Sequence, residues 1–147
     1  MSLFDSDGVE AHIGQFHSWQ EDSFESCTRE VHDRVRFKAP DALVCEGFVI
    51  RSNTSKLDAG AFSLTTDLIG ACRLLAHQAG IPFVRQTPAE AKSFATDDKL
   101  RRLGWYRPTK GGHANDASRH LLTFLAKQNY SPILQALTAE TPLATHP

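Results

Sequence analysis

The sequence lacks two features that would place it in a membrane or a secretory pathway. No stretch of its 147 residues approaches the ~18 to 20 consecutive apolar residues of a membrane span. The short, acidic N-terminus also lacks the basic and apolar regions of a signal peptide. We therefore expect a cytoplasmic protein with no membrane partner, and the length fits one domain.

Cysteine is scarce, with three residues at positions 27, 45 and 72 and no CxxC spacing. This pattern predicts neither a disulfide framework nor a thiolate zinc site. Cys45 stands beside Glu46 and could be a nucleophile. Because it lies in an apolar run, a buried, reduced thiol is the preferred interpretation.

Charge is nearly balanced, at −1 overall, but it is spread unevenly along the chain. Residues 1–33 hold eight acidic side chains against one basic, whereas residues 92–110 hold six basic against two acidic. A local basic patch can bind phosphates whatever the total charge. The alternative is a solvated basic face with two core aromatics, Trp105 and Tyr106.

Hydrophobic periodicity and turn residues predict alternating strands and helices, which indicates the α/β class. The expected elements are a hairpin over 2–16, a helix over 21–38, a strand over 42–50, a helix over 64–76, a strand over 81–84, a helix starting at Thr87-Pro88, a short helix over 97–103 and a last helix from about Asn115. We expect residues 1–130 to form the domain and residues 131–147 to form a C-terminal tail.

Glu46 interrupts the strand expected over 42–50, whose unbroken apolar character is typical of a strand buried on both faces. A carboxylate buried there would need a cationic partner or a metal, because an unpaired ionised group loses its hydration. The alternative is that Glu46 sits at the end of the strand, solvated or paired with a basic side chain.

A second candidate site is the glycine-rich loop that runs into His113-Ala114-Asn115-Asp116-Ala117. If the helical turn already includes His113, this residue shares a face with Asp116, and the two side chains can reach one cation. The alternative is that Asn115 or Asp116 caps the helix.

Three segments together resemble the RuvC-type Holliday junction resolvases of the ribonuclease H superfamily, especially those of phages. They are the strand at 42–48, the Thr87-Pro88 helix start with Lys92, and the cluster from His113 to Ala117. The resemblance covers about residues 2–128. It implies a ribonuclease H-like mixed sheet flanked by helices and an endonuclease that hydrolyses phosphodiesters in branched DNA, in a bacterial or phage-infected cell.

The resemblance also implies a divalent-metal site and a DNA-binding face. Glu46, His113 and Asp116 would be the catalytic residues and hold Mg²⁺ or Mn²⁺, which suit carboxylate ligands. Resolvases of this type act on two strands symmetrically, so we expect a homodimer. The residues expected to contact junction DNA are Lys92, Lys99, Arg101, Arg102 and Lys110 at phosphates, with Trp105 and Tyr106 stacking on bases.

One departure from the family pattern concerns its first strand, which ends in an aspartate followed closely by glycine and is missing here. Either the start is placed too late, or the chain is truncated, or the ligand has been lost. Asp5 or Asp7 could substitute for it. Two other functions stay open: a catalytically impaired module of the same fold that binds branched DNA, and an α/β domain in which Glu46 and Asp116 are structural.

Overall fold

The computed structural model describes residues 2–5, 15–18, 23–47, 59–108 and 112–139. The chain divides into two compact units, Glu21–Thr87 and the combination of Met1–Gln20 with Pro88–Pro147. We describe each unit by itself. Among the described helices, none is long and apolar enough to cross a membrane.

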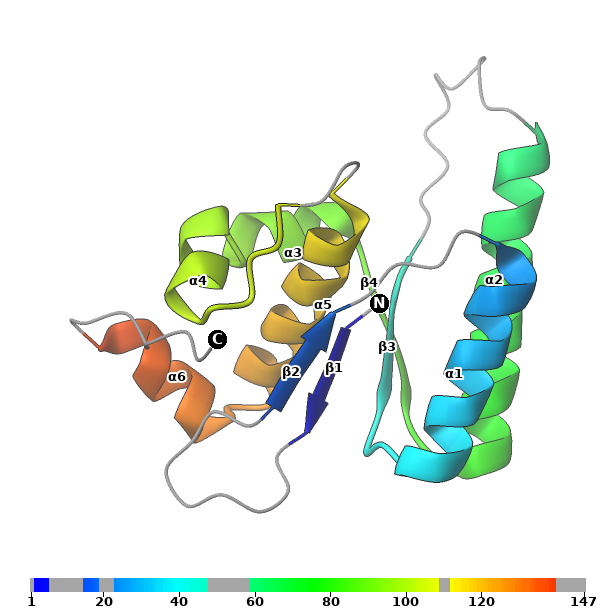
Figure 1. Ribbon diagram of the computed structural model, residues 1–147, viewed down its shortest axis with the longest axis horizontal. Coiled ribbons are helices and arrows are strands. Elements are labelled where there is room, and N and C mark those ends of the chain that lie inside the picture. Colours follow the sequence, from blue (N-terminus) through cyan, green and yellow to red (C-terminus); the bar gives the residue numbers. More distant parts are fainter. Residues whose placement is uncertain (1, 6–14, 19–22, 48–58, 109–111, 140–147) are drawn as a thin grey trace. The chain divides into compact units, whose positions relative to one another are not determined.

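The unit Glu21–Thr87 is built on a parallel pair of strands. It contains α1 (Phe24–Lys38), β3 (Leu43–Glu46), α2 (Ala59–Ala79) and β4 (Phe83–Gln86). Leu43 lies opposite Phe83, and Glu46 lies opposite Gln86. Parallel strands need a crossover connection, which α2 provides while it packs against both strands. Figure 1 shows α1 lying beside α2.

Local sequence explains both ends of α1. Ser23 is the N-cap, and its hydroxyl accepts a hydrogen bond from the Ser26 backbone N–H in a capping box. The helix ends at Lys38, and the C-cap Ala39 has a φ of 42°, in the left-handed region typical of a helix C-terminus. Val31 and Val35 are its buried residues, so the predicted amphipathic helix is confirmed.

The two strands of this unit have bounds that differ from those predicted. Within the expected strand over 42–50, β3 covers four residues, and residues 48–50 lie outside the described part of the chain. Its apolar side chains are half-buried, so the expectation of burial on both faces was wrong within this unit, where α2 supplies the cover. β4 begins two residues later than expected: Pro82 accepts a hydrogen bond from the Leu43 N–H at 2.9 Å through its carbonyl oxygen, but it has no N–H to donate to β3.

In its described residues, the second unit combines a short hairpin with four helices. They are β1 (Ser2–Asp5), β2 (Gln15–Ser18), α3 (Pro88–Phe94), α4 (Asp97–Arg102), α5 (His113–Lys127) and α6 (Ser131–Thr138). α5 is central, since it contacts β1, α3, α4 and α6 (Figure 1). With one antiparallel and one parallel strand pair among the described residues, the predicted α/β class is confirmed.

The predicted hairpin is present, although its second arm differs from the expectation. β1 and β2 pair antiparallel, with Phe4 opposite Phe16. The second arm therefore lies at 15–18 rather than along the alternating residues 9–13. Those residues, together with the expected turn over 6–8, lie outside the described part of the chain.

The core of the second unit joins α4, α5 and α6. Leu100, Leu122 and Ile133 are fully buried there, and Trp105 is 3% exposed. Ile133 belongs to α6, in the segment expected to be a tail. That expectation was wrong for residues 131–138, because an apolar face anchors them to the core; residues 140–147 lie outside the described residues.

Candidate metal and nucleic-acid site

The helix that carries the candidate cluster begins at His113. Gly112 precedes it as the N-cap with φ of 71°, a conformation that favours glycine. The first turn therefore includes both His113, which is exposed, and Asp116. The alternative that Asn115 or Asp116 caps the helix is excluded, because both residues lie inside α5.

Asn115 has a structural task within this cluster. Its side chain is buried, and both ends of its amide bind the backbone of Arg107. Asn115 Oδ1 accepts from the Arg107 N–H at 2.9 Å, and Nδ2 donates to the Arg107 carbonyl oxygen at 2.6 Å. The pair ties the segment after Trp105 to the first turn of α5.

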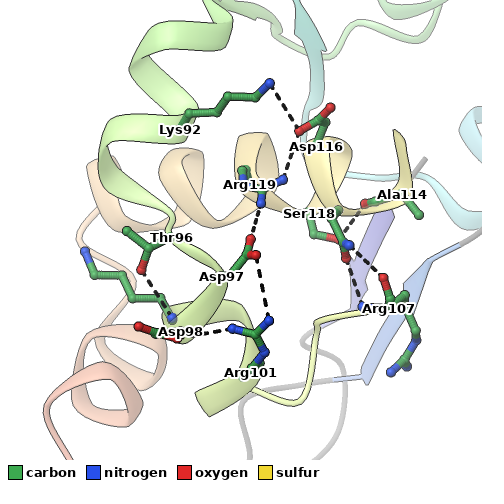
Figure 2. Close-up of polar contacts among 12 residues, drawn as sticks. Lys92, Thr96, Asp97, Asp98, Arg101, Arg107, Ala114, Asp116, Ser118 and Arg119 are labelled. Carbon is green, nitrogen blue, oxygen red and sulfur yellow. Dashed lines mark hydrogen bonds and ion pairs between the residues drawn. The ribbon is translucent and has the colours of Figure 1, made fainter. Parts of the chain in front are cut away.

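Asp116 is half-buried and faces two cationic side chains (Figure 2). Arg119 Nη1 donates to Asp116 Oδ1 at 2.9 Å, and Lys92 Nζ lies 3.7 Å from the same oxygen. Within the described residues, Asp116 Oδ2 has no hydrogen-bond partner. One oxygen of the carboxylate is thus held, and the other is available to a cation.

Arg119 extends this network to a second carboxylate, Asp97, at the start of α4. Its Nη2 donates to Asp97 Oδ1, while Asp97 Oδ2 lies 3.8 Å from Arg101 Nη2. Asp116, Arg119 and Asp97 also line one surface pocket with Lys92 and Thr96. Sequence reasoning missed Arg119 and Asp97 as a pair because 22 positions separate them and no local motif links them.

Glu46 is the last residue of β3 and is exposed. This placement matches the alternative in which Glu46 ends the strand. An exposed carboxylate keeps its hydration, so burial does not require a metal or a cationic partner for Glu46. Glu46 belongs to the unit Glu21–Thr87, whereas His113 and Asp116 belong to the other unit. Its role in a shared metal site therefore stays a prediction.

Cys72 is buried and Cys45 is half-buried. Burial raises the pKa of Cys45 from its ordinary value of 9.0 to about 11, although the nearby guanidinium of Arg85 acts in the opposite direction. Burial raises the pKa of Cys72 to about 12. Because the thiolate is the nucleophilic form, these shifts favour the packing interpretation of Cys45 over the nucleophile.

The basic residues expected to contact DNA differ in their exposure and in the groups that they bind. Lys92 and Arg101 have side chains more than half exposed. Arg101 also stacks over the ring of the half-buried Tyr106, with its Cζ 4.3 Å from the ring centroid. Lys99 donates to the Phe94 carbonyl oxygen at 2.7 Å, and Arg102 donates to the Leu137 carbonyl oxygen at 2.7 Å.

Trp105 is removed from the expected set of base-stacking residues. Because its side chain is packed into the α4–α6 core, the indole has no exposed face to offer to a base. The interpretation of Trp105 as a core aromatic is the one that fits. Lys110 and Asp7 lie outside the described residues, and Asp5 is the last residue of β1.

Within the described part of each unit, no three His, Cys, Asp or Glu side chains come together as a metal-binding group. His113 and Asp116 supply two potential ligands on one helical turn. Imidazole and carboxylate groups are common ligands of divalent metals. Asp116 Oδ2 has no hydrogen-bond partner among the described residues. The two residues fit a shared cation but do not complete its site.

Comparison with known proteins identifies the fold. No protein-family model and no curated protein matches the chain. Among solved structures, the chain is similar to a Thermus thermophilus RuvC structure, with a TM-score of 0.52, 17% identity and 87% of each chain covered. A T. thermophilus RuvC in complex with Holliday junction substrate matches with a TM-score of 0.49, 20% identity and 78% of each chain covered. The chain has a RuvC-like α/β fold.

Proposed function

We propose that this protein is a metal-dependent endonuclease of the RuvC resolvase type that hydrolyses phosphodiesters in branched DNA such as Holliday junctions. The observation that carries the proposal is the first turn of α5, which presents His113 and Asp116 together on a RuvC-like fold. In this proposal, Glu46 completes the ligand set from the carboxyl end of β3. In open α/β sheets, ligands bind at the carboxyl ends of parallel strands, which supports that position.

Each candidate ligand has a distinct task. The carboxylates of Glu46 and Asp116 and the imidazole of His113 would hold Mg²⁺ or Mn²⁺. Such ions activate the attacking water and stabilise the leaving oxygen of the phosphodiester. Asp116 is prepared for this task because Arg119 and Lys92 both approach Oδ1 and leave Oδ2 to a metal.

In this proposal, the exposed cations Lys92 and Arg101 contact the DNA phosphates. Of the predicted basic residues that the structure describes, these two are exposed to solvent, whereas Lys99 and Arg102 are half-buried and bind backbone carbonyls. Tyr106, half-buried under Arg101, is the aromatic that remains a candidate for stacking on a base. We expect the active species to be a homodimer, because a junction has two strands to nick symmetrically.

A second candidate function is a catalytically impaired module that binds branched DNA without cutting it. The observation that favours it is that the described part of each unit holds fewer than three clustered metal ligands. Such a module would bind a junction through its basic side chains alone. Metal would then have no effect on the DNA backbone.

The test is cleavage of a synthetic four-way junction by the full chain in Mg²⁺ or Mn²⁺ and in EDTA. We expect nicking in the metal, and loss of nicking in Glu46→Gln and Asp116→Asn. Matched controls are Glu25→Gln and Asp67→Asn, which remove exposed carboxylates on α1 and α2. These controls should cut as the parent does.

The outcomes separate the two functions. Robust cleavage by Glu46→Gln or Asp116→Asn would remove the catalytic assignment of that residue. Junction binding in EDTA with no nicking in Mn²⁺ would instead support the binding module. If the parent chain binds the junction neither in EDTA nor in Mn²⁺, Glu46 and Asp116 are structural residues of an α/β domain unrelated to DNA.

A further inference from the structure

Arg119 occupies an unusual place between two carboxylates from different helices. Its Nη1 binds Asp116 Oδ1 at 2.9 Å, one turn earlier on α5, and its Nη2 binds Asp97 at the start of α4. Figure 2 shows the guanidinium between the two acids. The Arg119 side chain is 16% exposed, less than that of Asp116 at 28% or Asp97 at 41%. A planar guanidinium held at both ends is fixed in orientation.

Asp97 is anchored independently of Arg119. Thr96 caps α4 by accepting a hydrogen bond from the Lys99 N–H at 3.4 Å, which fixes the residue that follows it. Ala95, just before the cap, is fully buried. The contact from Arg119 therefore links Asp116 to a helix start whose backbone is already set.

The two cations near Asp116 are not equivalent. Lys92 is 60% exposed and lies 3.7 Å from Oδ1, so its pair with Asp116 is weak and screened by water. Arg119 is closer and less exposed, and Asp97 offsets the positive charge that would otherwise repel a metal beside Asp116. Arg119 can hold the carboxylate without adding net charge to the pocket.

We propose that Arg119, held by Asp97, is a positioning residue that fixes the Asp116 carboxylate so that Oδ2 faces the divalent metal. This inference rests on the proposed function, because it requires Asp116 to be a metal ligand. Partners that orient metal ligands through a hydrogen bond commonly change metal affinity by about 10- to 100-fold when removed. Arg119 should act on metal affinity in the same way.

The test is the Mn²⁺ affinity of the full chain, measured by isothermal titration calorimetry without DNA. Arg119→Met should weaken binding about tenfold or more. Asp97→Asn should weaken it in the same direction by a smaller factor, since it removes the anchor but keeps the contact with Asp116. Arg119→Lys keeps the charge but not the two-ended fork, so it should restore part of the affinity.

Arg73→Met, at an exposed site on α2, is the matched control and should bind Mn²⁺ as the parent does. Thermal unfolding of every variant separates folding from binding. If Arg119→Met does not fold, Asp97→Asn carries the test. Unchanged or tighter Mn²⁺ binding by a folded Arg119→Met or Asp97→Asn would overturn the positioning role.

Asp116→Asn distinguishes this inference from the proposed function. If Asp116→Asn loses Mn²⁺ affinity while Arg119→Met and Asp97→Asn keep it, the metal role of Asp116 survives and the positioning role fails. If Asp116→Asn binds Mn²⁺ as the parent does, both fail together. Loss in Asp116→Asn with graded loss in Arg119→Met and Asp97→Asn supports both.

Discussion

Asn115 illustrates how one buried side chain can hold the candidate site in place. Its amide donates to and accepts from the same backbone residue, Arg107, and a carboxylate of equal size could only accept. The residue lies beside Asp116 in the sequence and faces the core instead of the pocket. Its identity is therefore set by the backbone it binds.

We predict that Asn115→Asp destabilises the fold by about 2–4 kcal/mol, because a buried charge would face the Arg107 carbonyl oxygen without a donor. Asn115→Ala should cost less, about 1–3 kcal/mol, since it removes two hydrogen bonds and adds no charge. Urea unfolding at neutral pH measures both. Equal stability of the aspartate variant and the parent would contradict the described contacts.

The buried thiols predict a pH dependence of stability. The folded pKa values of about 11 for Cys45 and about 12 for Cys72 lie above the ordinary value of 9.0. The folded state therefore favours the protonated thiols, and the stability they contribute is complete below pH 9. That contribution is lost as pH rises from 9.0 through about 11 for Cys45 and about 12 for Cys72.

Urea unfolding at about pH 8, below the unfolded pKa values, and at about pH 10.5, between the unfolded and folded values, checks this dependence. The parent should lose stability over this interval. A Cys45→Ala/Cys72→Ala double variant should lose less, although it starts from lower stability because two packed side chains are shortened. An equal loss of unfolding free energy between the two pH values in the parent and the double variant would contradict the role of the thiols.

At the scale of elements, α6 depends on a contact from α4. Arg102 Nη1 donates to the carbonyl oxygens of Leu137 at 2.7 Å and Ala139 at 3.1 Å. These groups lie at the C-terminal end of α6, where carbonyls lack partners within the helix. A cation there also complements the helix dipole.

Arg102→Met should therefore destabilise the unit by about 1–2 kcal/mol and release the end of α6. Arg101→Met is the matched control, because Arg101 binds exposed carboxylates and should contribute less than about 1 kcal/mol. Hydrogen exchange of the α6 amides gives the local measurement. Equal protection of α6 in the two variants would argue against the cap.

Several elements could be predicted from the sequence because their signals are local. Pro40 follows α1, and Thr87-Pro88 marks the start of α3, within one residue of the predicted boundaries. α6 lies in the segment predicted as a tail, and its Pro132 stands in the first helical turn, where proline costs no hydrogen bond. The strand ends were less predictable, since pairing between β3 and β4 decides them.

The site was predictable in part for the same reason. His113 and Asp116 share a turn, which spacing alone can indicate. Trp105 and Arg102 are near neighbours in the basic segment, yet one packs into the core and the other caps α6. Sequence clustering reveals charge but not direction, so the roles of individual side chains needed the structure.

At the scale of the whole molecule, a net charge of −1 combined with a basic segment predicts salt-dependent DNA binding. The logarithm of junction affinity should fall linearly with the logarithm of salt concentration, by about 0.9 for each phosphate neutralised. Lys92→Ala should reduce that slope by about one, whereas Arg73→Ala on α2 should leave it unchanged. Filter binding in EDTA measures both. Affinity that does not vary with salt would exclude a phosphate-binding role for the basic segment.

The proposed function makes Glu46 and Asp116 ligands of the same divalent metal. A crystal structure of the full chain with Mn²⁺, located by its anomalous scattering, tests this most directly. We expect Mn²⁺ bound by both carboxylates, with ions about 4 Å apart if two are present. Carboxylates more than about 8 Å apart, or Mn²⁺ bound at neither, would contradict it.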